Sequence, residues 1–188
     1  NYMTRERTVG IFYVKLCHQL DTFRFWFGEP ARLMAYAPPS VLKQYTVPDN
    51  VEAVVDFPGG KAGMIIFSAS RGAQVGGVND HPDRGHHYEF VLTGTEGALV
   101  YDAWSECVDH IRFNHREDLK TELAERIKVR ERYGEPSYDV GTQNLDFLES
   151  VRDGRAPRHP ASDALKSMIL VEKAEESLRR GGEWIACG

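Results

Sequence analysis

The stretch VEAVVDFPGGKAGMIIFSAS, residues 51–70, indicates which kind of sheet this chain builds. Two apolar runs flank Pro58, Gly59 and Gly60. Glycines between two such runs supply the positive φ that a tight hairpin turn needs, so the runs are expected to be antiparallel strands. The second run, AGMIIFSA (62–69), is apolar at both alternating sets of positions. Both faces of this strand are therefore expected to be buried.

Further strand-like runs follow along the chain. HYEFVLT (87–93) and GALVYDAW (97–104) flank the sequence GTEG and predict a second hairpin. Single strands are expected at 31–37, 106–113 and 183–187.

Helical patterns stand at both ends of this strand region. An opening helix is expected to run from Gly10 or Phe12 to Phe27, because apolar residues recur at helical spacing and Gly28 follows. After the strands, helices are expected at about 114–133, where Asn114 and Glu117 form a capping box, at 139–153, and from Ser162, as the N-cap, to about 180.

The order helix, strands, helices predicts an α+β fold. We expect an open, mainly antiparallel β-sheet with helices packed on one face and the other face available for oligomerisation. Because no linker or repeat divides the chain, one domain should cover residues 1–188. An uncovered apolar sheet face is rare in monomers, so a homo-oligomer through that face is expected.

Composition excludes several classes of function. The 188 residues carry a net charge of -5, which argues against a nucleic-acid surface. No apolar run approaches the roughly 20 residues that a membrane span needs. The three cysteines are far apart and odd in number, as expected of reduced thiols in a cytoplasmic protein. Neither nucleic acid nor a membrane is expected as a partner.

The opening helix carries the residues best suited to chemistry. Lys15, His18 and Asp21 follow one another at a spacing of three and are helical neighbours. The carboxylate of Asp21 could hold the imidazole in one tautomer, so that His18 takes a proton from a substrate hydroxyl, and Lys15 could polarise the same oxygen. The alternative is that Asp21 is merely solvated and that His18 satisfies a backbone carbonyl.

Sites for cofactors and metals are not indicated. Neither GxGxxG nor GxxxxGK[ST] occurs, and GGKAG (59–63) lies inside a hairpin, so no dinucleotide-binding residues are expected. The sequence NDHPDRGHHYEF (79–90) contains His81, His86 and His87, but their spacing fits no chelating pattern. No metal is therefore expected. A polar loop beside a cleft, where His86 and His87 hydrogen-bond a polyhydroxylated ligand, is the favoured interpretation; metal-dependent chemistry at the three histidines is the weaker one.

The sequence KLCHQLDTFRFWFGEP (15–30) resembles the helix that opens the C-terminal domain of the Gfo/Idh/MocA oxidoreductases, the relatives of glucose-fructose oxidoreductase and inositol dehydrogenase. The hairpin at 51–70, the GTEG hairpin and the closing helices (147–184) follow in the family's order. The resemblance extends from Gly10 to Trp184.

This resemblance implies that cofactor binding and substrate binding belong to two different domains. In the family, an N-terminal Rossmann domain binds NAD or NADP and carries a catalytic lysine, and this chain contains neither. The C-terminal half supplies the open sheet, the substrate pocket and the oligomer interface. His18 matches the family's proton-transferring cleft histidine, and Asp21 matches the aspartate one turn later. Val14 stands where relatives carry an acid, which leaves Lys15 as the candidate helper.

The function implied is that of a substrate-binding and oligomerisation domain of an NAD(P)-dependent oxidoreductase for a sugar, cyclitol or similar polyol. His18 and Lys15 would be catalytic, and Asp21, His86 and His87 would bind substrate. Without the missing Rossmann domain this chain would not be catalytically competent. A free-standing, non-catalytic binding or assembly module of the same fold is the alternative.

Overall fold

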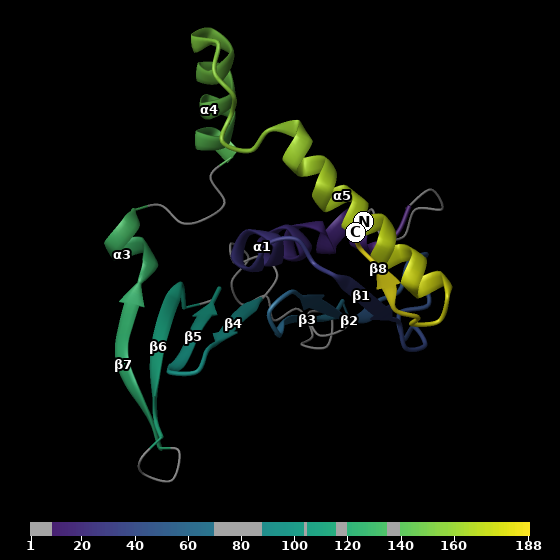
Figure 1. Cartoon of the computed structure of the whole chain (residues 1–188), viewed down its shortest axis with the longest axis horizontal. Helices are drawn as coiled ribbons and strands as arrows, with labels where there is room; N and C mark the ends of the chain where they lie inside the picture. The colour runs from purple at the N-terminus through teal and green to yellow at the C-terminus, as the bar shows by residue number, and fades with distance from the viewer. Residues whose placement is uncertain (1–8, 70–87, 104, 116–119, 135–139) are drawn as a thin grey trace. The chain divides into compact units, whose positions relative to one another are not determined.

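The computed structural model describes residues 9–69, 88–103, 105–115, 120–134 and 140–188. Contacts gather in two compact units, Asn1–Gly76 with Ala156–Gly188 and, separately, Gly77–Arg155. Each unit contains one four-stranded sheet in which all neighbouring strands are antiparallel (Figure 1). The predicted α+β class with open, antiparallel strand pairing is confirmed, but the strands form two sheets where one was predicted. The single domain over 1–188 stays a prediction.

The sheet of the first unit has the strand order β3-β2-β1-β8. The hairpin expected from residues 51–70 joins its first two strands, and Gly59 and Gly60 in the turn have φ of 79° and 76°, as the tight turn requires. The strands are β1 (Arg32–Tyr36), β2 (Asn50–Phe57), β3 (Lys61–Ser68) and β8 (Ile185–Ala186).

Three helical segments pack on one face of this sheet: η2, a π-helical turn (Phe12–Leu16), α1 (Cys17–Phe27) and α5 (Ala161–Arg179) (Figure 1). The apolar stripe predicted for the opening helix is buried, with Leu20 at its centre. Gly63 allows α1 to sit close to β3, because a Cβ at Gly63 would lie 2.5 Å from the ring of Phe23. The core includes Leu33, Ala35, Val51, Val55, Leu170 and Val171.

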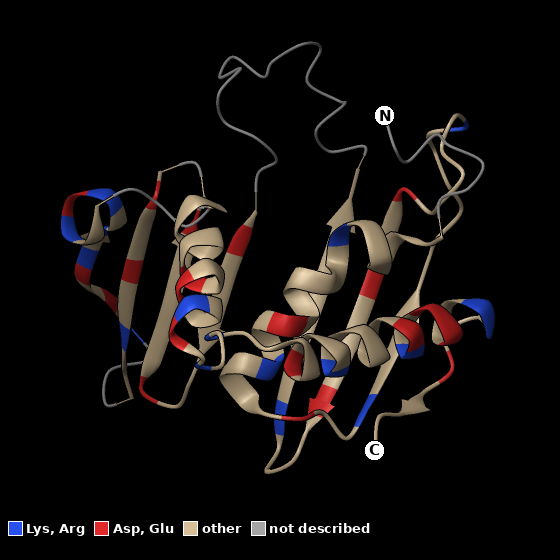
Figure 2. Cartoon of the chain, turned by 90° about the horizontal axis from the view of Figure 1, so that it is seen from above, with Lys and Arg blue, Asp and Glu red and all other residues tan. Residues whose placement is uncertain are grey.

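Two buried polar residues of α5 connect this helix to the rest of the unit. Ser177 accepts a hydrogen bond from the backbone N–H of Ala35 at 2.8 Å, and Glu175 accepts one from the backbone N–H of Phe12, also at 2.8 Å. Burial raises the pKa of Glu175. The predicted cap of α5 is wrong: the helix begins at Ala161, after Pro160, so Ser162 already lies inside its first turn. Both acidic and basic residues occur along α5 (Figure 2).

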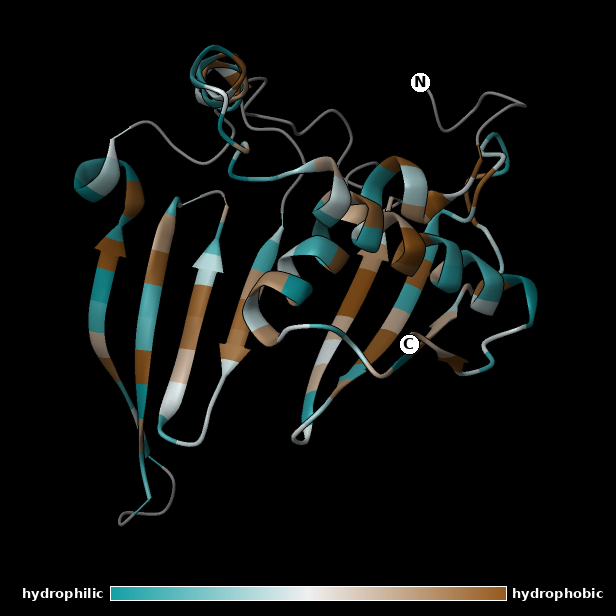
Figure 3. Cartoon of the chain, turned by 45° about the horizontal axis from the view of Figure 1, so that its top comes forward, coloured by the Kyte–Doolittle hydropathy of each residue, from teal (hydrophilic) through white to brown (hydrophobic). Residues whose placement is uncertain are grey.

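The second unit contains the sheet β4-β5-β6-β7, and apolar residues run along its strands (Figure 3). The predicted GTEG hairpin joins its first two strands. Among the described residues, no helix in either unit is both long and apolar enough to cross a membrane. The elements are β4 (Glu89–Thr93), β5 (Gly97–Asp102), β6 (Cys107–Asn114), β7 (Lys120–Lys128), α3 (Val129–Tyr133) and α4 (Val140–Asp153).

The helix predicted over residues 114–133 is wrong for most of its length. Residues 120–128 form strand β7, and only Val129–Tyr133 are helical. Leu123 and Ile127 are four residues apart, a spacing that suits a helix but is also a multiple of the strand period of two. Pairing with β6 decides the outcome. A bulge at Ala124 then sets Leu123 opposite Ile111 and Ile127 opposite Val108.

The outer face of the first unit's sheet, opposite the helices, is accessible and mixed: apolar Met64 and Ile66 lie beside charged Glu52 and Asp56 of β2. Met64 is 65% exposed and Ile66 is 76% exposed, whereas the intervening Ile65 is 5% exposed and faces the core. The expectation that both faces of residues 62–69 are buried is therefore not met within this unit. Coverage of that face requires another molecule or another segment.

Candidate functional site

The opening helix presents its predicted imidazole to solvent. His18 is exposed near the start of α1, and Lys15 lies half-buried in the π-helical turn that precedes it. The backbone carbonyl of His18 accepts a hydrogen bond from the Thr22 hydroxyl at 2.8 Å. Phe25, on the same exposed side of the helix, is 86% exposed. His18 is thus accessible to a ligand and is not packed in the core.

The predicted pair of Asp21 and His18 is not formed in the described part of the chain. Oδ1 of Asp21 accepts hydrogen bonds from the Ser167 hydroxyl and, at 3.3 Å, from Arg24, and no hydrogen bond joins Asp21 to the imidazole. The physical reason is that Asp21 and Arg24 turn together toward α5. Asp21 therefore helps to join two helices in this structure. Its expected part in substrate binding stays a prediction.

His86 and His87 lie outside the described residues, so their expected contact with a ligand also stays a prediction. His81, the third histidine of that stretch, lies outside them too.

Arg24 is the centre of a polar network between α1 and α5. Its side chain is only 6% exposed. The guanidinium donates two hydrogen bonds to Glu29, at 2.8 and 3.1 Å, and one to Ser167, at 2.7 Å. It donates two more to Asp163, one to Oδ1 at 2.9 Å and one to the backbone carbonyl at 3.3 Å. This fork of donors suits carboxylates better than a lysine would. The network holds the beginning of α5 against the end of α1.

The charges in this network stabilise one another. The Arg24 guanidinium lowers the pKa of Glu29 and that of Asp163, and these carboxylates, Glu29 foremost, raise the pKa of Arg24. Lys166 adds a second cation, 3.3 Å from Glu29. Both carboxylates are therefore ionised at neutral pH.

A pocket of about 270 Å³ opens beside this network. His159 lies at its edge, with Nδ1 3.3 Å from Oδ2 of Asp163. Sequence reasoning missed Arg24, His159 and Asp163 as members of one site. Only the spacing of Arg24 from Asp21 gave a local signal, since the other two residues come from a helix far along the chain. The lining residues are Asp21, Arg24, Phe25, Glu29, His159 and Asp163.

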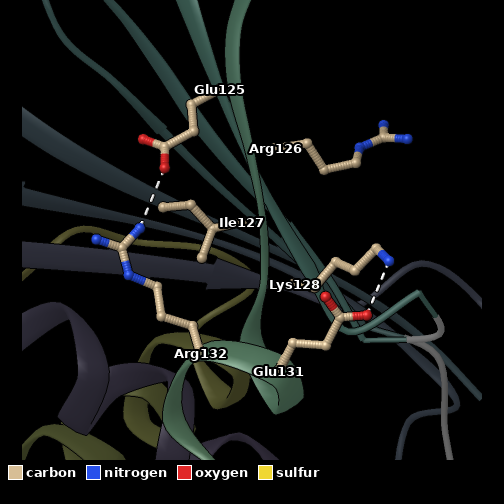
Figure 4. Close-up of a pocket in the computed structure, with 6 residues that line it drawn as sticks. All are labelled: Glu125, Arg126, Ile127, Lys128, Glu131 and Arg132. Atoms are coloured by element: carbon tan, nitrogen blue, oxygen red, sulfur yellow. Dashed lines mark hydrogen bonds and ion pairs between the residues drawn. The ribbon is translucent and has the colours of Figure 1, made fainter.

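A second pocket, of about 320 Å³, lies where β7 meets α3 in the second unit (Figure 4). Its charged side chains are already paired: Arg132 with Glu125 at 3.1 Å, and Lys128 with Glu131 at 2.8 Å. Arg126 in turn pairs with Asp109 outside the pocket. Because these pairs satisfy the charges that a ligand would use, we assign no site here.

The geometry allows one kind of chemistry on α1. An exposed imidazole can take a proton from a hydroxyl placed beside it, and an ammonium one turn earlier can stabilise the oxygen that results. Hydride transfer would also need a dinucleotide. A dinucleotide phosphate is commonly bound by a glycine-rich loop at the start of a helix. Among the described residues, only the opening helix directly follows a glycine, Gly10, and the sequence before it is not glycine-rich.

Comparisons with known proteins agree with this architecture. Residues 2–186 match the model of the Gfo/Idh/MocA oxidoreductase family's C-terminal alpha/beta domain. No curated protein matches the chain.

Solved structures share the fold at low sequence identity. An oxidoreductase from Agrobacterium radiobacter in complex with NAD+, L-tartaric acid and magnesium is 18% identical, with a TM-score of 0.70 over 100% of this chain and 52% of that one. The WlbA dehydrogenase from Bordetella pertussis in complex with NADH and UDP-GlcNAcA is 17% identical, with a TM-score of 0.66 over 94% and 47% of the two chains. A levoglucosan dehydrogenase in complex with NADH and L-sorbose is 15% identical, with a TM-score of 0.61 over 93% and 50%.

This chain spans about half the length of the structures that it matches. The family match covers nearly all of its residues, and the predicted resemblance is confirmed. The chain belongs to the Gfo/Idh/MocA oxidoreductase family and corresponds to its C-terminal alpha/beta domain.

Proposed function

We propose that this chain is the substrate-binding and oligomerisation domain of an NAD(P)-dependent oxidoreductase that acts on a sugar, cyclitol or similar polyol. The observation that carries the proposal is the exposed imidazole of His18, on a helix of a domain from an oxidoreductase family. Complexes of similar structures with NADH and L-sorbose or UDP-GlcNAcA support a polyhydroxylated substrate.

In this proposal His18 accepts the proton of the substrate hydroxyl that is oxidised, and Lys15 stabilises the oxygen as that proton leaves. A nicotinamide cofactor, when bound, supplies the acceptor for the hydride. Asp21, His86 and His87 contribute to holding the substrate. The remainder of the enzyme would cover the exposed side of α1 near Phe25 and so exclude water from the reacting atoms.

NAD or NADP would be bound by a Rossmann domain outside these 188 residues. Two observations support this: no glycine-rich dinucleotide motif occurs in the sequence, and the chain spans about half of its structural relatives. The cytoplasm is the proposed location, supported by three cysteines that are all free thiols.

Titration of the isolated chain with NAD and NADP tests this division of labour. We expect no saturable binding in calorimetry up to millimolar cofactor, whereas the same chain joined to an upstream dinucleotide domain should bind. Tight binding of either cofactor to these 188 residues would refute the proposal.

The alternative function is a free-standing, non-catalytic binding or assembly module. Val14 favours it, because the family pattern that the sequence resembles has an acid at that position of the helix. The reading frame upstream of Asn1 separates the two functions. A strand followed by GxGxxG supports the enzyme, and a start codon at Met3 supports the module.

The proposed oligomer forms through the outer face of the first unit's sheet. Met64, Ile66 and Tyr36, which is 46% exposed, lie on that face and form an apolar patch, with Arg32, Glu52 and Asp56 beside it. Burying such a surface against a second copy removes it from water in both molecules.

Replacing Ile66 by glutamate should separate the oligomer. A carboxylate in an apolar interface loses its hydration, which costs about 2 kcal/mol and weakens association roughly thirtyfold. Sedimentation velocity at micromolar concentration measures the change. The matched control is Gln44→Glu, which adds the same charge at an exposed loop position. A wild-type chain that sediments as a monomer would rule out this interface.

A further inference from the structure

We propose that Asp21, His159 and Asp163 form a binding site for a divalent transition-metal ion between α1 and the beginning of α5. One imidazole nitrogen and two carboxylate oxygens, one from each residue, lie within 4.8 Å of one another. The same three residues line the pocket of about 270 Å³ beside Arg24. The mixed donor set and its accessible pocket are the observations behind this proposal.

Each carboxylate of the cluster keeps one oxygen outside the Arg24 network. Asp163 accepts from Arg24 with Oδ1, at 2.9 Å, and turns Oδ2 toward Nδ1 of His159, 3.3 Å away. Asp21 likewise uses Oδ1 for its bonds to Arg24 and Ser167. The second oxygen of each carboxylate and the imidazole nitrogen are therefore the atoms that would contact an ion.

The surrounding residues would hold these ligands in place. Metal-binding carboxylates are commonly hydrogen-bonded by a second layer of side chains, which fixes their orientation. Arg24 and Ser167 perform that task here. Two hydrogen bonds from Arg24 to Glu29 balance the guanidinium charge, and Lys166 also pairs with Glu29. Counting Asp21, Glu29 and Asp163 against Arg24 and Lys166 leaves one negative charge, which favours a cation.

The donor types select the class of ion. Magnesium and calcium prefer oxygen ligands alone, whereas an imidazole nitrogen suits zinc and its neighbours. Three protein ligands would leave a fourth position for water. Bonds of 2.0–2.2 Å place tetrahedral ligands about 3.4 Å apart, so the cluster must contract. The three side chains are 39%, 52% and 40% exposed and have the freedom to do so.

Calorimetric titration of the 188-residue chain with Zn²⁺, after EDTA treatment and buffer exchange, tests the site. We expect saturable binding of one ion in this region, and His159→Gln should weaken it at least tenfold. Among the described residues His159 forms no hydrogen bond or ion pair with Arg24, so this variant should keep its circular dichroism and its melting temperature in EDTA. A Co²⁺ titration should show tetrahedral absorption bands that the variant lacks.

A second variant separates this site from the histidine-rich stretch. The triple change His81→Gln, His86→Gln, His87→Gln removes other imidazoles and should leave the Co²⁺ bands and the effect of His159→Gln unchanged. Loss of the Co²⁺ bands in the triple variant would overturn the proposal. So would a chain that does not bind Zn²⁺, or one whose Zn²⁺ affinity is unchanged by His159→Gln. Mg²⁺ that binds as tightly as Zn²⁺ would contradict the ion class. Neither readout measures turnover, so the outcome is independent of the proposed oxidoreductase function.

Discussion

Replacement of Arg24 by alanine is expected to lower the free energy of unfolding by about 3 kcal/mol. The guanidinium is 6% exposed and donates hydrogen bonds to Glu29, Asp163 and Ser167. Removing it deletes charge-assisted bonds and leaves space between α1 and α5. The carboxylates that lose their partner are 39–56% exposed, so water can solvate them. This keeps the expected loss at the lower end of the range for a broken buried ion pair.

Urea unfolding of the chain measures the effect as a shift of the midpoint at constant slope. Arg24→Lys should recover part of the loss, since an ammonium keeps the charge but cannot reproduce the fork of donors. Arg179→Ala is the matched control: Arg179 is 60% exposed and pairs with Glu172 on the surface of α5, so its loss should stay below about 1 kcal/mol. Equal effects of the two alanine variants would show that the network adds no stability.

The fold could be predicted from the sequence wherever a sequence pattern is compatible with only one secondary structure. Residues 51–70 combine two apolar runs with turn glycines, and only a hairpin satisfies both. Residues 120–128 carry no such local signal. Their charged sequence and the spacing of Leu123 and Ile127 suit a helix and a strand equally, and pairing with β6 decides between them. The pairing of β7 with β6 could not be predicted from the sequence alone, because it depends on tertiary structure.

The residues of the candidate site also differ in whether their contacts could be predicted from the sequence. His18 could be selected from the sequence because its own helix determines that it lies away from the buried stripe. The partner of Asp21 could not, because Ser167 comes from α5 and competes with the nearby imidazole. Helical spacing shows which side chains can meet, whereas packing between distant elements determines which of them do. His159 and Asp163 stayed unrecognised for this reason.

In the full-length oxidoreductase proposed above, His18→Gln is expected to lower kcat by about 10²–10⁴-fold, the usual contribution of a general base. Glutamine is similar in size and polar but cannot accept the proton. The KM of the polyol and the affinity for NAD or NADP should change little. The assay is reduction of NAD or NADP across a panel of sugars and cyclitols.

Stability and a second histidine provide the controls. His18 is exposed, so the glutamine variant should unfold at the same urea concentration as the wild type. His115→Gln, which removes an exposed imidazole that is hydrogen-bonded to the Thr95 carbonyl, should keep full activity. Lys15→Met should lower kcat less than His18→Gln, because it removes stabilisation of the oxygen but not the proton acceptor. Activity of His18→Gln within twofold of the wild type would eliminate His18 as the base, because the loss of a general base lowers the rate far more than twofold.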